Sequence, residues 1–170
     1  MGETIAGRTA STMSGLDIGE QRAWQNFLDA ALRLYATLNR ELVEAHRLTL
    51  NDVRLLDVLD RSPTGSARMG DLAEELMSLP SRVTRQTHRL ETHRLVSRCS
   101  SPDDGRGVLA TITDDGREVL RSAMSTYGDG VRSHFLSQLS RTQTAAMGDN
   151  CRRIGTTLRS NQMPARVGRV

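Results

Sequence analysis

Apolar residues recur every three or four positions in the first part of the chain, from about Asp17 onward. This spacing predicts an amphipathic helix that ends near His46. Such a helix would have about 28 residues and a length of about 42 Å. A small domain does not need a helix of that length, so we expect part of it to contact a second subunit. The apolar stripe consists of Trp24, Leu28, Ala31, Tyr35, Leu38 and Leu42.

Two shorter helical patterns follow. Thr49 is expected to be the N-cap of the first, with Asp52 three residues later completing a capping box. The turn-forming residues 62–66 end that helix. The second pattern predicts a short helix over Met69–Leu76, so the two helices should be joined by a brief loop.

The next helix is predicted over about Ser81–Thr92, and it has two different faces. Pro80 stands where the first turn of a helix tolerates proline. The inner face is expected to consist of Val83, Thr87 and Leu90. Another face carries Arg82, Arg85 and Arg89. One side of this helix should therefore pack, while another projects guanidinium groups.

Two short runs with the composition of strands come next, Leu95–Cys99 and Val108–Ile112. The segment 100–107 between them contains proline, Asp-Gly and a further glycine, which predicts a β-hairpin.

After the hairpin, Thr113 is expected to cap a long helix. Gly128 and Gly130 interrupt the pattern of this helix and predict a bend or break. A last helix is predicted over roughly Arg141–Leu158.

The order of these elements predicts a mainly α (α+β) fold, a winged helix-turn-helix with N- and C-terminal dimerisation helices. The hydrophobic fraction of 37% is lean, which favours an oligomer that gains burial from a partner subunit. The expected organisation is a disordered arm at 1–16, an N-terminal dimerisation helix at 17–48, a winged helix-turn-helix lobe at 49–112, C-terminal dimerisation helices at 113–160 and a basic tail at 161–170.

The positive charge of the chain is local. The net charge is only +3, but the segment 78–101 contains five arginines and one acidic residue and so carries +4. The chain contains no lysine, so all 23 of its lysine or arginine residues are arginine. Arginine is the residue best suited to bidentate contacts with phosphate and guanine. A compositional bias explains most of the use of arginine in place of lysine. The concentration of positive charge in one segment is typical of a nucleic-acid interface.

A helix of this kind fits the major groove of B-DNA, where its first turns reach the edges of the bases. The tip of the hairpin would bring Arg106 to the adjacent minor groove or backbone. The residues expected to contact double-stranded DNA from the helix are Ser81, Arg82, Thr84, Arg85, Gln86 and Arg89.

Other classes of function find little support. There is no glycine-rich phosphate loop and no arrangement of residues for nucleophilic catalysis, so no enzyme, cofactor or metal site is expected. No segment has the apolar length of a membrane helix, and no signal peptide is recognisable. Cys99 and Cys151 are far apart in the sequence, which fits a reducing, cytoplasmic location.

The segment 71–120 resembles the MarR family, the multiple-antibiotic-resistance regulators. The family's Asp-x-Arg wing pattern corresponds to Asp104-Gly105-Arg106, and its Leu-Thr-x-x-Gly pattern corresponds to 112–116, here Ile-Thr-Asp-Asp-Gly. The chain departs from the family at Arg94, where a glycine usually ends the recognition helix in a left-handed conformation. Arginine there is expected to cost about 1 kcal/mol.

The resemblance implies a homodimer that binds a pseudo-palindromic operator, with Arg106 inserted at the wing and held by Asp104. It also implies a small aromatic or phenolic effector that releases the DNA, and we expect the protein to be a repressor.

Two alternatives stay open. Cys99 and Cys151 would be the sensors of a thiol-based redox regulator. A helix-turn-helix domain can also serve protein contacts without binding DNA.

Overall fold

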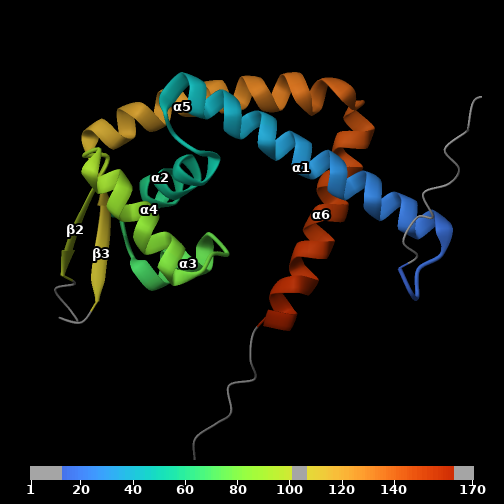
Figure 1. The fold of residues 1–170 in the computed structure, drawn as a ribbon, viewed down its shortest axis with the longest axis horizontal. Helices are drawn as coiled ribbons and strands as arrows, with labels where there is room; N and C mark the ends of the chain where they lie inside the picture. The colour runs from blue at the N-terminus through green and yellow to red at the C-terminus, as the bar shows by residue number, and fades with distance from the viewer. Residues whose placement is uncertain (1–12, 101–106, 163–170) are drawn as a thin grey trace, which may run out of the picture. The chain divides into compact units, whose positions relative to one another are not determined.

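The computed structural model describes residues 13–100 and 107–162 of the chain, with side chains described as far as Ser160 (Figure 1). The chain divides into two units, residues 1–37 and residues 38–170. Most of the predicted arm at 1–16 and of the predicted tail at 161–170 lies outside the described residues. The elements are α1 (Ile18–His46), α2 (Leu50–Arg61), β1 (Ser66–Arg68), α3 (Met69–Glu75), α4 (Pro80–Thr92), β2 (Val96–Ser100), β3 (Val108–Ile112), α5 (Asp114–His134), the 3-10 helix η1 (Leu136–Gln138) and α6 (Arg141–Gln162).

Local capping signals set the starts of the helices. Asp17 and Glu20 each accept a hydrogen bond from the other's backbone N–H, at 2.9 Å, immediately before α1. Thr49 and Asp52 form the predicted capping box at the start of α2. Pro80 occupies the first turn of α4. These three starts lie within one residue of the predicted ones.

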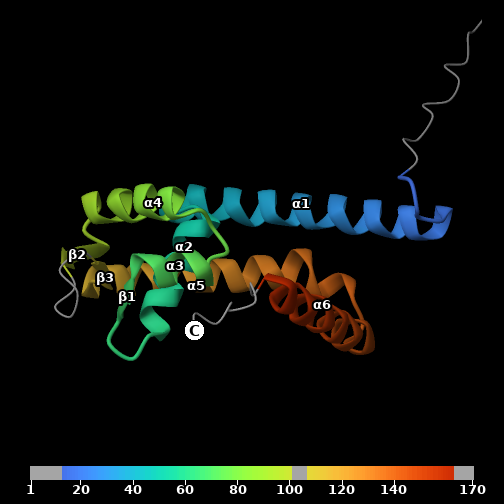
Figure 2. The ribbon, with the colours of Figure 1, turned by 90° about the horizontal axis from the view of Figure 1, so that it is seen from below.

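The three strands form an antiparallel sheet in the order β1-β3-β2 (Figure 2). The predicted hairpin is confirmed, with Val96 opposite Ile112 and Ser100 opposite Val108. Strand β1 was not predicted, because its first residue, Ser66, belongs to the turn signals at 62–66 and only two residues follow it before α3. It pairs with β3, and the hydroxyl oxygens of Ser66 and Thr111 lie 2.8 Å apart.

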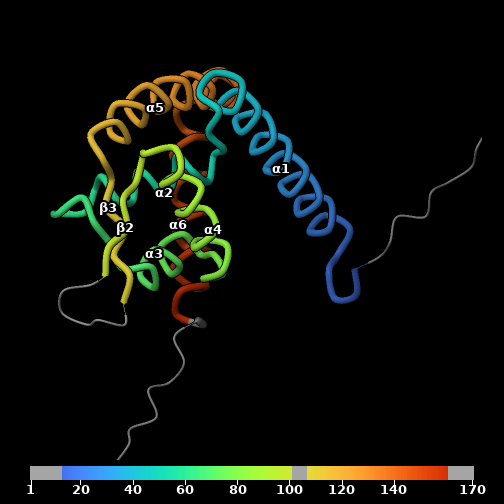
Figure 3. The backbone as a smooth tube through the Cα atoms, turned by 60° about the vertical axis from the view of Figure 1, so that its left-hand side comes forward, coloured from blue at the N-terminus to red at the C-terminus, as the bar shows by residue number. Residues whose placement is uncertain are grey.

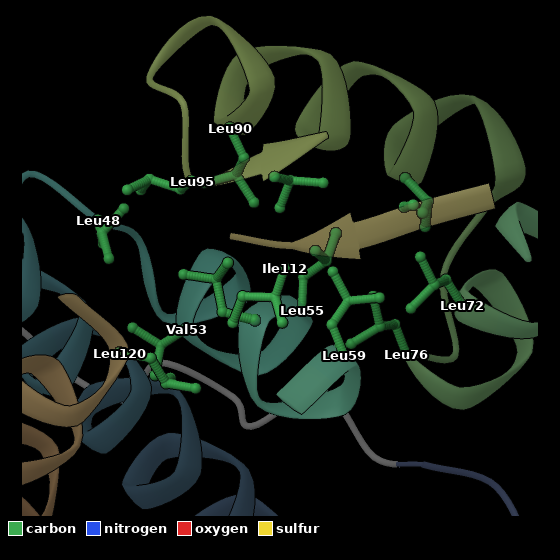
Figure 4. Close-up of a cluster of buried hydrophobic side chains, with 14 of the residues drawn as sticks. Leu48, Val53, Leu55, Leu59, Leu72, Leu76, Leu90, Leu95, Ile112 and Leu120 are labelled. Atoms are coloured by element: carbon green, nitrogen blue, oxygen red, sulfur yellow. The ribbon is translucent and has the colours of Figure 1, made fainter. Parts of the chain in front are cut away.

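Apolar residues of α2, α3, α4, β2, β3 and α5 meet in one core, largely of leucine (Figure 4). Leu55, Leu56 and Leu59 of α2 are completely buried. Val83 and Leu90 contribute the inner face of α4, as the sequence predicted. The core therefore joins the recognition segment, the sheet and the first half of α5 in one lobe.

A bend or break was predicted at Gly128 and Gly130. Helix α5 runs without interruption from Asp114 to His134, so the break is wrong, and the bend stays a prediction. A Cβ atom at Gly130 would lie 2.7 Å from side-chain atoms of both Leu38 and Glu41. Glycine thus permits a close approach of the end of α1 to α5, and it does not end the helix.

None of the helices in the described ranges is long and apolar enough to cross a membrane.

Candidate nucleic-acid interface

The helix-turn-helix is built from α3, a tight turn and α4 (Figure 3). Met77 ends α3 with a φ of 48°, in the left-handed region. The N–H groups of Met77 and Ser78 donate to the carbonyl oxygens of Glu74 and Ala73, at 3.0 and 2.9 Å. These are the two hydrogen bonds of a Schellman motif. The chain therefore reverses within a few residues and enters α4 at Pro80.

The faces of α4 separate as predicted. Val83, Thr87 and Leu90 are each 0% exposed. Four of the predicted DNA-contacting residues lie on the exposed side of the helix, namely Ser81, Arg82, Thr84 and Arg85. The hydroxyl group of Thr84 donates to the carbonyl oxygen of Pro80 at 2.9 Å, which orients that side chain along the first turn.

The two remaining predicted residues of α4 differ from these four: one has a buried amide group, and the other has an ion-pair partner within the protein. Gln86 is partly buried, and its amide nitrogen lacks a hydrogen-bond partner among the described residues. Arg89 donates to the buried carboxylate of Asp52 on α2. The assignment of Arg89 to the DNA-contacting set stays a prediction, and its guanidinium group already has a partner within the protein.

Asp52 was predicted only as a capping residue. Its carboxylate is 0% exposed, so it also places a negative charge under α4. The capping-box pattern accounts for this aspartate fully in local terms, and Arg89 lies 37 positions away. No local signal in the sequence connects the two residues.

The wing is the hairpin of β2 and β3. Its tip, with Asp104 and Arg106, lies outside the described residues. On β2, Arg98 forms an ion pair with Glu91 of α4, with 2.6 Å between the closest atoms. The hydrogen bond from the Arg98 guanidinium group lowers the pKa of Glu91, and the charge of His88 acts in the same direction. Arg98 thus ties the wing to α4.

The end of α4 has the left-handed residue that the family pattern places there. Arg94 has a φ of 61°. Its N–H donates to the carbonyl oxygen of Glu91 at 2.9 Å, and the N–H of Leu95 donates to that of Leu90 at 3.0 Å. This is a second Schellman motif, and its two flanking leucines are buried in the core. Helix α4 therefore ends in the same conformation that glycine would adopt. The arginine side chain retains the steric cost of that conformation.

The Thr-x-x-Gly pattern, at Thr113 and Gly116, holds the end of α4 next to the start of α5, and we call this contact the joint. The Thr113 hydroxyl group donates to the carbonyl oxygen of Arg94 at 2.8 Å and accepts from the N–H of Gly116 at 2.9 Å. The N–H of Thr113 donates to the carbonyl oxygen of Leu95 at 3.1 Å. A Cβ atom at Gly116 would clash with that same carbonyl oxygen. The pattern therefore binds the end of α4 to the start of α5.

The two cysteines are free and exposed, Cys99 on β2 and Cys151 on α6. The described ranges contain no group of three His, Cys, Asp or Glu residues arranged to hold a metal ion. A redox role for the cysteines stays a prediction.

The family model and the solved structures of AbsC and Sco3205 point to one family. Residues 47–107 match the model of the MarR family. The structure of AbsC, a MarR family transcriptional regulator from Streptomyces coelicolor, is similar with a TM-score of 0.80 and 30% identity, covering 87% of this chain and 99% of that one. Sco3205 from the same organism, a MarR family regulator solved in complex with DNA, has a TM-score of 0.81 and 30% identity, covering 91% of this chain and 95% of that one.

Two HTH-type transcriptional regulators of Bacillus subtilis (strain 168) are similar over a shorter stretch. YhbI is 38% identical over 64 residues, which are 38% of this chain and 42% of YhbI. YxaD is 41% identical over 58 residues, which are 34% of this chain and 41% of YxaD. The chain thus spans about two fifths of the length of these curated relatives. Because the match to AbsC and Sco3205 extends over nearly their whole length, together with the winged helix-turn-helix fold, the chain belongs to the MarR family of transcriptional regulators.

Proposed function

We propose that the protein is a transcriptional regulator that binds double-stranded DNA sequence-specifically, with α4 in the major groove. The observation that carries this proposal is the exposed polar face on the first turns of α4, opposite a fully buried face. The similarity to Sco3205 supports this proposal, because Sco3205 was solved in complex with DNA and the similarity covers 95% of its chain.

The first turns of α4 supply the base contacts in this proposal. Arg85 is the residue best suited to a bidentate contact with guanine, and Ser81 and Thr84 suit contacts with bases or phosphate. Arg82 and Gln86 complete the set. At the wing, Asp104 holds Arg106 for insertion into the minor groove, which rests on the sequence pattern alone.

We propose a homodimer on a pseudo-palindromic operator. Apolar side chains of α1 and α6 stand exposed in the single chain, among them Leu32 at 61% and Ile154 at 60%. Burial of such side chains favours association. Two recognition helices would then read half-sites about 34 Å apart.

The regulatory proposal is repression in the cytoplasm, with no catalytic activity. A bound operator blocks the polymerase, and a small aromatic or phenolic effector changes the spacing of the two lobes and releases the DNA.

Selection of bound sequences from random duplex DNA tests the proposal. The selected duplex should bind with an affinity that falls steeply as salt is added. Replacing Arg85 by alanine should cost about 1–3 kcal/mol and relax the preference at one base pair. Arg121→Ala, which removes an exposed arginine of α5, is the matched control.

Wild-type affinity in the Arg85→Ala variant at fixed salt would show that the docking is wrong. Failure of the wild-type protein to bind any duplex would favour a protein-contact module.

A further inference from the structure

The carboxylate of Asp52, on α2, contacts both the residue that precedes α2 and a residue of α4. Its Oδ2 atom accepts hydrogen bonds from the backbone N–H of Thr49 at 2.8 Å and from the Thr49 hydroxyl group at 2.5 Å. The same oxygen accepts from the Arg89 guanidinium group. The residue before α2, α2 itself and the second half of α4 therefore meet at one atom.

The burial of Asp52 is complete, whereas Arg89 keeps 43% of its side chain exposed. A buried carboxylate that loses its cation is strongly destabilised, because the surrounding protein solvates the charge poorly. A phosphate of DNA at the protein surface competes for Arg89 in a medium of higher dielectric constant, where the attraction is weaker. The pair with Asp52 should therefore survive DNA binding.

The three arginines on this face of α4 thus differ from one another. Arg82 and Arg85 have no ion pair within the described part of the chain, and both are exposed. Arg89 lies on the same face by spacing, but its guanidinium group is held towards α2. The first two cations remain available to a polyanion.

We propose that Asp52 is a positioning residue for DNA recognition. It withdraws Arg89 from the cations that contact DNA and fixes the angle of α4 against α2, so that the first turns of α4 enter the groove in one orientation. This inference rests on the proposed DNA binding. It means that Asp52, which lies outside the interface, contributes to the specificity of that binding.

The test is a double variant, Asp52→Asn with Arg89→Gln. The asparagine oxygen can still accept from Thr49, and no uncompensated charge is left in the core. Two quantities are measured on the selected operator and on a random duplex, the slope of log affinity against log salt and the ratio of the two affinities. All variants are compared at a temperature where thermal unfolding shows them to be folded.

The double variant should keep the wild-type salt slope, because no phosphate contact has been removed. The ratio of specific to random affinity should fall roughly 10-fold, as the orientation of α4 loosens. Arg89→Lys, which preserves a cation beside Asp52, should keep most of this ratio. Arg82→Gln should instead lower the magnitude of the salt slope by about 0.9 per subunit.

A matched control neutralises a second ion pair of α2. Asp57, which is partly buried, and Arg61, which is exposed, form a pair with 2.8 Å between the closest atoms. Asp57→Asn with Arg61→Gln should match the wild type in both quantities.

Two results would overturn the inference. A salt slope lowered as in Arg82→Gln would show that Arg89 contacts phosphate. A wild-type affinity ratio in the double variant would show that the pair has no part in positioning. If the wild-type protein bound no duplex at all, the proposed function would fail first, and this inference with it.

Discussion

The winged lobe and the terminal helices bury their apolar side chains to different degrees. In the lobe, Leu55, Leu56 and Leu59 are 0% exposed. In the part of α1 that precedes Leu38, most of the large apolar side chains are exposed by 40% or more: Ile18, Trp24, Phe27, Leu28, Leu32 and Tyr35. Leu34 is partly buried. In α6, Met147, Ile154 and Leu158 are exposed as well. The lobe completes its core within one chain, whereas the terminal helices have apolar faces that one chain does not cover.

A core substitution in the lobe should have the largest effect on stability. Leu56→Ala removes a completely buried side chain, and we expect the free energy of unfolding to fall by about 3 kcal/mol. Denaturant unfolding followed by circular dichroism measures it. Leu32→Ala, at an exposed position of α1, is the comparison. An equal loss of stability in both variants at a concentration where the chain is monomeric would remove the contrast between the regions.

A charge on the apolar face of α1 should act on association instead. Leu28→Asp is expected to raise the dissociation constant of the proposed dimer roughly 100-fold, because the carboxylate would lose its hydration in the interface. Analytical ultracentrifugation measures this constant. Asn26→Asp introduces the same group on the other side of the helix and should leave the constant near that of the wild type. Equal constants for the wild type and Leu28→Asp would place the dimer contacts elsewhere.

The left-handed residue at the end of α4 offers a smaller, opposite change. Arg94→Gly removes the steric cost of a side chain at φ 61° but adds freedom to the unfolded chain. The net effect should be a gain of about 0.5 kcal/mol in the stability of the lobe, with dimer association unchanged. His93→Gly, at φ −87°, should instead lose about 0.5 kcal/mol. A loss in both variants would mean that the Arg94 side chain makes contacts that outweigh its strain.

The smallest expected effect is a pH dependence at the contact of α4 with the wing. Because Arg98 lowers the pKa of Glu91 in the folded protein, this carboxylate contributes stability above the ordinary glutamate pKa, about 4.3. The contribution is lost as the pH falls through the lowered pKa. Glu91→Gln should therefore melt at a lower temperature than the wild type near neutral pH, and the difference should close in acid.

Thermal unfolding across the acidic range measures this difference. Glu75→Gln, which removes an exposed carboxylate of α3, is the control. A difference between wild type and Glu91→Gln that stayed constant with pH would contradict the assignment to Arg98.

Much of the lobe could be predicted because its signals are local. The signals that start its helices each act within three or four residues: Thr49 with Asp52, Pro80, and Thr113 with Gly116. The buried face of α4 follows from helical spacing. The left-handed conformation of Arg94 was anticipated only through the resemblance to the MarR family, in which a glycine usually stands at this place.

Contacts between distant segments could not be predicted in this way. The pair of Asp52 with Arg89 depends on how two helices pack, and each residue had a sufficient local explanation. Gly130 looked like a helix breaker, because the sequence does not show that Leu38 and Glu41 approach it. Strand β1 exists through its pairing with β3, which no pattern within three residues indicates.

The joint at Thr113 has a mechanical consequence. The hydroxyl group and the backbone N–H of Thr113 connect the end of α4, the start of the wing and the first turn of α5. Glycine at position 116 permits the close approach of these segments. A rotation of α5 would therefore move the recognition helix α4 with it, because these contacts hold the two helix ends together. The lobe should therefore behave as a lever and not as a hinge, and amide protons at the joint should be among the last to exchange with deuterium.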